Sequence, residues 1–227
     1  TCHLSLVTCH LSLVTCHFPT AMRISHTIRV LITSDFLINA GMSVFAPVFA
    51  VFVTKQIVDG SVEVVGFAAA TAQLVKAMLQ IPVARWLDRN HGEYDDFYSM
   101  VTGSGIIALT PFMYLFASQA WHLYVIQAWF GIGAALAVPP WYAIFTRHID
   151  KMRENVEWSL ESVAIGISGA GAAALSGIIV SHFGFRWAFL LGGVFAVFGA
   201  IMQIRIYSDL RMFVRRGEVQ VLPDKPG

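Results

Sequence analysis

Residues 162–207 decide the fold, and they read SVAIGISGAGAAALSGIIVSHFGFRWAFLLGGVFAVFGAIMQIRIY. A short break at Gly184 separates two apolar runs, 162–183 and 185–207. Each run has the length of about 20 residues that a helix needs to cross a hydrocarbon core of roughly 30 Å. Lipid offers the backbone no hydrogen-bond partner. Each run is therefore predicted to be a transmembrane helix that pairs its own N–H and C=O groups.

The chain before this stretch adds four more apolar runs. They occupy residues 30–53, 62–87, 100–117 and 121–146. These runs are too long and too continuous for the roughly 10-residue alternating strands of a membrane barrel. The sequence therefore predicts an all-α membrane protein, with six transmembrane helices in one bundle over residues 22–210.

The composition agrees with a lipid environment. Hydrophobic residues make up 56% of the 227-residue chain, only 13% are charged, and the mean hydropathy is +0.65. Soluble domains carry about 25% charged residues. This shortage of charge excludes a disordered chain and a nucleic-acid-binding arm. We expect the lipid bilayer, and no nucleic acid, as a partner.

Basic residues lie mostly on one side of the six predicted helices. Twelve lie on the side that holds both chain ends, and only Lys55 and Arg186 lie in the opposite loops. Because Lys and Arg gather in cytoplasmic loops, we expect both termini in the cytoplasm and the protein in a plasma membrane of bacterial type. The twelve are Arg23, Arg29, Arg85, Arg89, Arg147, Lys151, Arg153, Arg205, Arg211, Arg215, Arg216 and Lys225.

The two ends of the chain differ from the bundle. TCHLSLV occurs twice in tandem over residues 1–14, and a partial copy fills 15–21 before Met22. We interpret residues 1–21 as non-native or disordered sequence and expect the native start at Met22. All three cysteines lie in this segment, each followed by a histidine, but their spacing does not match that of zinc sites, so no metal site is predicted. Residues 211–227 are expected to form a cytoplasmic tail.

Spans one and four share a spacing of glycine and proline. Gly41 is followed six residues later by Pro47, and Gly133 is followed six residues later by Pro139. Both prolines are expected to kink their helices. If spans one to three and four to six are two copies, an odd number of helices per copy makes the copies inverted. The sequence therefore predicts a 3+3 inverted repeat, as in many transporters.

Two full charges, Asp35 and Lys76, lie inside predicted spans. A buried charge in a membrane helix costs at least about 2.5–3.5 kcal/mol, so such charges usually pair or line a wet cavity. We predict a substrate or proton cavity built on Asp35 and Lys76, with Asn39, Gln73 and Gln127 as polar neighbours. A structural ion pair, or a Lys76 that extends toward the cytoplasm, is the alternative.

Span five carries small residues at helical spacing. Gly169, Ala173 and Gly177 fall on one face. Small side chains there let two helix backbones approach closely, which predicts a helix-packing face. A face along which a neighbouring helix slides is the sharper alternative.

The loop between spans two and three reads RWLDRNHGEYDDF over residues 85–97. Asp88 and Arg89 followed by Gly92 resemble the cytoplasmic loop motif of the major facilitator superfamily. PPWYAIFTRHID at 139–150 and GFRWAF at 184–189 agree with this resemblance. It implies a gate role for Asp88, Arg89 and Gly92. Here the chain departs from the motif, because acidic residues follow Gly92 where the family has basic ones; the alternative is that this acidic cluster forms a solvated loop face.

The resemblance implies the amino-terminal six-helix half of such a transporter. Family members have twelve helices in two bundles, with the substrate site between the bundles. It therefore implies secondary active transport of a small solute by alternating access, with the chain as a half-transporter or a fragment and a carboxy-terminal half or a second copy as partner. A non-transporting membrane scaffold or assembly protein and the product of a decayed transporter gene are the alternatives.

The second cytoplasmic loop, 147–161, is rich in both signs of charge. Glu154 and Glu157 precede span five, where acidic side chains favour a helix start through the helix dipole. We expect this structural role for both residues, with a gate contact as the alternative.

An enzyme is not predicted. Gly166, Ser168 and Gly169 resemble the GxSG signature of intramembrane serine proteases, but a nucleophilic serine needs a histidine within hydrogen-bond reach. His182 lies 14 residues along the same predicted helix, which is about 21 Å at helical rise. We expect no catalytic residue and no cofactor.

Overall fold

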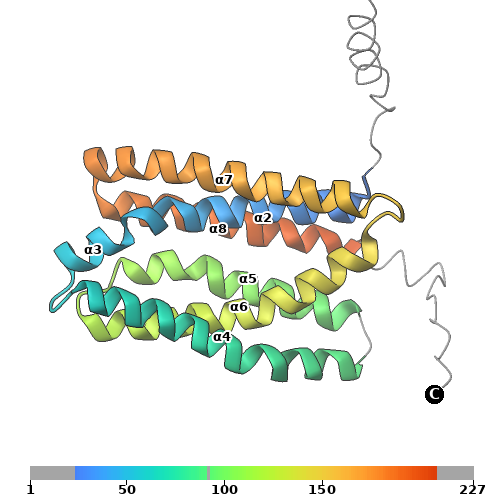
Figure 1. Cartoon of the computed structure of the whole chain (residues 1–227), viewed down its shortest axis with the longest axis horizontal. Helices are drawn as coiled ribbons and strands as arrows, with labels where there is room; N and C mark the ends of the chain where they lie inside the picture. The colour runs from blue at the N-terminus through green and yellow to red at the C-terminus, as the bar shows by residue number, and fades with distance from the viewer. Residues whose placement is uncertain (1–23, 91–92, 209–227) are drawn as a thin grey trace, which may run out of the picture.

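The computed structural model describes residues 24–90 and 93–208 (Figure 1). Residues 1–21, Gly92 and residues 211–227, on which several predictions fall, lie outside this part. The described chain is helical except for its connections, two of which are joined by an isolated β-bridge between Val58 and Gln119. The helices are α2 (His26–Phe45), η1 (Ala46–Val48), α3 (Phe49–Gln56), α4 (Val62–Asn90), α5 (Glu93–Tyr114), α6 (Ala120–His148), α7 (Glu154–Phe183), α8 (Phe185–Gln203) and η2 (Ile204–Ile206).

The long helices lie side by side along one direction (Figure 1). In the described residues, five helical segments are long and apolar enough to cross a membrane. They are His26–Gln56, Val62–Arg89, Ala120–His148, Glu154–Phe183 and Phe185–Ile206. The all-α prediction is confirmed and the five match five of the expected spans. The sixth, at 100–117, corresponds to α5, which has three acidic residues in its first turn and Pro111 inside, and its crossing stays a prediction.

Several helices extend beyond the apolar runs that predicted them. α7 begins at Glu154, eight residues before the expected 162, and α5 begins at Glu93 rather than at 100. Hydropathy detects only the apolar part of a helix. The charged first turns can be helical too, because acidic side chains there favour the positive end of the helix dipole.

The two predicted kinks differ in the structure. At Pro47 the first span breaks into α2, the short 3₁₀ turn η1 and α3, because proline removes a backbone donor and clashes with the preceding turn. At Pro139 and Pro140 the helix continues, and α6 runs as one segment from Ala120 to His148.

The neighbours of each helix form a symmetric pattern. α2 packs against α7 and α8, α6 packs against α4 and α5, and α5 packs against α8. The pattern stays the same when α2 is exchanged for α6, α4 for α7 and α5 for α8. Apolar clusters fill both ends of the bundle. One is built around Leu31 and Phe145, and the other around Phe52 and Phe189, whose rings lie 4.8 Å apart.

Glycines set the closest helix crossings. A Cβ on Gly41 would lie 2.4 Å from the Gly192 carbonyl oxygen, so α2 and α8 touch backbone to backbone. A Cβ on Gly103 would lie 2.6 Å from the Gly133 carbonyl oxygen, which places α5 equally close to α6. Removing the side chain at these points allows an approach that any Cβ would prevent.

The predicted packing face of α7 is only partly turned toward α2. Gly169 and Ala173 are half-buried, and a Cβ on Gly169 would lie 3.4 Å from the Asn39 amide nitrogen of α2. Gly177 is exposed and a Cβ there would have open space, while the fully buried small residues are Ser168, Ala172 and Ser176. Spacing alone predicts that residues share a face. Which face turns inward depends on the rotation of the helix about its axis.

Candidate functional site: a carboxyl pair in an aromatic-walled cavity

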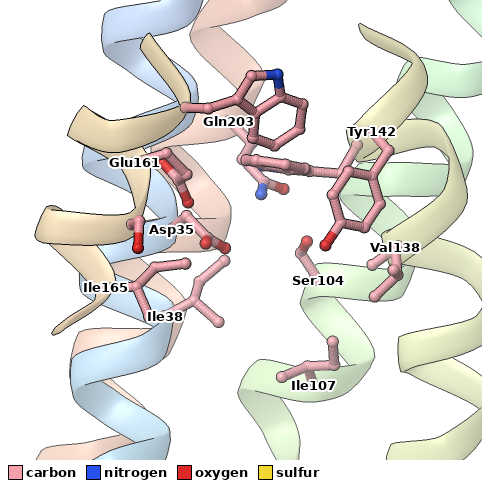
Figure 2. A pocket seen from close by; sticks show the side chains of 13 residues that line it. Asp35, Ile38, Ser104, Ile107, Val138, Tyr142, Glu161, Ile165 and Gln203 are labelled. Atoms are coloured by element: carbon pink, nitrogen blue, oxygen red, sulfur yellow. The ribbon is translucent and has the colours of Figure 1, made fainter. Parts of the chain in front are cut away.

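A cavity of about 350 Å³ lies between α2, α5, α6, α7 and the end of α8. Each of these helices contributes a polar side chain. They are Asp35, Ser104, Tyr142, Glu161 and Gln203. Figure 2 shows the carboxyl oxygens of Asp35 and Glu161 close together on one wall, with the hydroxyls of Ser104 and Tyr142 across the space. The remaining lining is mostly aliphatic and aromatic.

Asp35 and Glu161 form a carboxyl pair. Glu161 is only 3% exposed, Asp35 is half-buried, and their carboxyl groups lie close together on one wall of the cavity. Both Glu161 oxygens are buried without a hydrogen-bond donor among the described residues. Because the oxygens of an ionised carboxylate only accept hydrogen bonds, the pair presents acceptors and negative charge to the cavity.

Aromatic rings form another wall of the cavity. Trp141 and Tyr142 of α6 and Trp158 of α7 all line it. The Trp158 ring lies 5.9 Å from that of Tyr142 and 4.5 Å from that of Phe145, on which Trp141 stacks at 5.0 Å. These contacts fix the rings against each other, so the wall is formed before any ligand arrives.

Asn39 fastens α2 to α7 just beside the cavity. Its amide donates to the Ile165 carbonyl at 3.0 Å and to the Ser168 hydroxyl at 2.8 Å. The Ser168 hydroxyl in turn donates to the Ile165 carbonyl. Asn39 lies one helical turn from Asp35 on α2 but is not among the residues that line the cavity, and its amide protons serve helix packing. Ser168, whose surroundings in the sequence resemble a GxSG signature, belongs to the same contact.

The structure does not bring Lys76 to Asp35. Lys76 and Gln73 lie on α4, which packs against α6, whereas Asp35 lies on α2, which packs against α7 and α8. Gln73 is exposed, and Lys76 and Gln127 are half-buried outside the cavity lining. The described partner of Asp35 is Glu161 instead. The predicted pairing required spans one and two to be neighbours, and the bundle places α7 in that position.

Sequence reasoning missed Glu161 because it assigned this residue to a loop. The apolar run begins at 162, so hydropathy stops one residue short. A signal was available in the helical period: Glu157 and Glu161 continue the face of Ser168, Ala172 and Ser176, and all five are buried. Two acidic residues in phase with a packing face indicate burial rather than solvation.

The acidic residues after the gate motif are not all solvated. Asp96, only 6% exposed, forms an ion pair with Arg147 at 2.5 Å, which joins the start of α5 to the end of α6. Asp88 and Arg89 are exposed in the last turns of α4. The solvated loop face proposed as the alternative for this cluster is therefore wrong for Asp96.

The chain matches the family model of the Major Facilitator Superfamily over residues 31–217. The chain belongs to this superfamily. No curated protein matches it. Members of the superfamily are membrane transporters rather than enzymes, so this chain is an integral membrane protein of a family that moves small solutes.

Proposed function

We propose that the chain is one bundle of a secondary transporter and that a small solute binds at the Asp35–Glu161 cavity. The observation that carries this proposal is the buried carboxyl pair in a cavity lined by five helical segments. Carboxyl groups inside a membrane raise the free energy of the folded protein, and they are found mainly along substrate or ion pathways. Their presence therefore favours a transporter over an inert membrane bundle.

The internal symmetry of the bundle supports the proposed 3+3 inverted repeat. Transporters with such repeats work by alternating access, in which two units move against one another. The neighbour pattern survives exchange of its halves. The glycine crossings obey the same exchange, since Gly41 meets Gly192 as Gly133 meets Gly103. In this layout α5 is the third span and is equivalent to α8, the sixth span.

A second bundle is part of the proposal. Large apolar side chains of α4 and α7 point outward, among them Leu74, Met78, Ile167 and Leu175. Some face lipid, and others are available to a carboxy-terminal half or a second copy. Gln73, Lys76 and Gln127 join the substrate path through that partner. Asp88, Arg89 and Gly92 keep their proposed role at the cytoplasmic gate, with both termini on that side.

Single-cysteine labelling tests alternating access without a known substrate. The test chain carries Cys2→Ser, Cys9→Ser and Cys16→Ser together with Ser104→Cys in the cavity. A membrane-impermeant maleimide should label the cavity cysteine from either side of sealed, oriented vesicles, because each conformation opens the cavity to one side.

A matched chain with Ser208→Cys in place of Ser104→Cys serves as the control. Ser208 is exposed beyond η2, so its cysteine should react from one side only. Labelling of the cavity cysteine from a single side would contradict alternating access and would favour the non-transporting scaffold.

A further inference from the structure

The cavity lining is negatively charged. Among its thirteen described residues there are two carboxyl groups, Asp35 and Glu161, and no Lys, Arg or His. An ionised carboxylate here lies in a largely apolar space, where an opposite charge is stabilised more strongly than in water. An anion would meet repulsion and a neutral solute would leave the negative charge unpaired. The lining therefore favours a cation.

Buried oxygen atoms of the cavity lack hydrogen-bond donors in the described part of the chain. Besides the Glu161 oxygens, the side-chain oxygen of Gln203 is buried without a hydrogen-bond partner in the described residues, and Gln203 is 1% exposed. Gln203 and Glu161 come from different helices and line the same space. A buried acceptor without a donor costs about 1–3 kcal/mol. An N–H group of a ligand between them would remove that cost.

The aromatic wall distinguishes among cations. Trp141, Tyr142 and Trp158 line the cavity, and the face of an indole or phenol ring attracts a cation within about 6 Å of its centre. A metal ion such as Ca²⁺ is usually held by several carboxylates, and the described residues contain no group of three or more Asp, Glu, His or Cys side chains placed to hold one. The apolar walls instead fit the carbon part of an organic ion. The volume of about 350 Å³ is that of a small-molecule pocket.

We propose that the cavity binds a protonated organic amine, with its ammonium between Glu161, Asp35 and Gln203 and its aryl or alkyl group on Trp158 and Tyr142. This inference rests on the proposed function for the role of the cavity and names the class of solute that it takes.

The probe is phenethylammonium, titrated by calorimetry into the purified full-length chain in lipid nanodiscs. Two ligands of nearly equal size are the comparison: neutral 2-phenylethanol and the anion phenylacetate. The ammonium should bind at least about tenfold more tightly than either, since only it satisfies the charge and the open acceptors.

Variants assign the binding to the cavity. Glu161→Gln and Asp35→Asn keep the side-chain size and should each weaken phenethylammonium binding by about tenfold. Glu63→Gln is the matched control, because Glu63 is exposed at the start of α4, and its affinity should equal that of the unchanged chain. Trp158→Leu should weaken binding more than Trp158→Phe, while Trp187→Leu, at an exposed tryptophan of α8, should not. A thermal melt of each variant confirms folding.

Three results would overturn the amine site: no binding of phenethylammonium, equal binding of phenylacetate, or full affinity in both carboxyl variants. The outcome is independent of the cysteine test. Amine binding with one-sided labelling would retain the site and reject transport, whereas two-sided labelling without amine binding would retain transport and reject this solute class.

Discussion

At the residue scale, Glu161 shows how far a single position can depart from its sequence context. It follows a highly charged stretch, 147–160, yet its carboxyl is buried against Asp35. Asp35 was recognisable because it lies inside an apolar run. Glu161 was not, because the run begins one residue later and only helical phase reveals that it turns inward.

The glycine crossings lead to a prediction at the same scale. Gly41→Ala should lower the free energy of unfolding by about 1–3 kcal/mol, because the new methyl group meets the backbone of α8 and the helices must separate. Reversible denaturation in mixed micelles measures this change.

Gly177→Ala is the control for this prediction. Gly177 has open space around a Cβ, so alanine should leave stability within about 1 kcal/mol and on the favourable side, through its higher helix propensity. A loss at Gly177 equal to that at Gly41 would instead support the packing face predicted from Gly169, Ala173 and Gly177.

At the element scale, the ends of α5 and α6 are tied by one ion pair. Asp96 is buried and the Arg147 side chain is 45% exposed, so water screens part of the attraction. The bond closes the side of the bundle where positive-inside charge predicts the cytoplasm. It lies next to the proposed gate and can hold α5 in register with α6.

We predict that Asp96→Asn lowers stability by about 1 kcal/mol, a modest loss because Arg147 can be solvated when its partner is gone. A double-mutant cycle with Arg147→Gln isolates the pair, since the second change should cost little once the first is made. Asp95→Asn, in the same first turn of α5, is the control and should have a smaller effect. Fully additive losses at Asp96 and Arg147 would show that the ion pair contributes nothing.

At the scale of the whole molecule, the outward apolar surface of the bundle bears on whether a second bundle packs against it. The two outward helices, α4 and α7, carry apolar side chains along much of their length. Lipid can cover such a surface as well as protein can, so hydrophobicity alone does not select the partner. Transport by rocking motion nevertheless requires a second body.

The mass of the gene product in native membranes tests for this partner. An antibody to residues 147–161 should detect either a denatured band near twice 25.0 kDa, from a covalent second half, or a band near 25.0 kDa with a doubled protein mass in mild detergent. A lone bundle of 25.0 kDa in mild detergent would contradict the paired transporter.

The sequence by itself determined five helices able to span a membrane, the superfamily, the break at Pro47 and the position of Asp35 inside an apolar run. These follow from local properties: the length of apolar runs, the backbone chemistry of proline and the cost of a charge in lipid. The tertiary structure alone decided that Asp35 lies beside Glu161 rather than Lys76, and that Ser168 of α7 is buried while Gly177 is exposed. Both depend on which helices become neighbours and how each is rotated. A rotation of 100° per residue turns a one-residue difference into a different environment, and no local property of the chain specifies it.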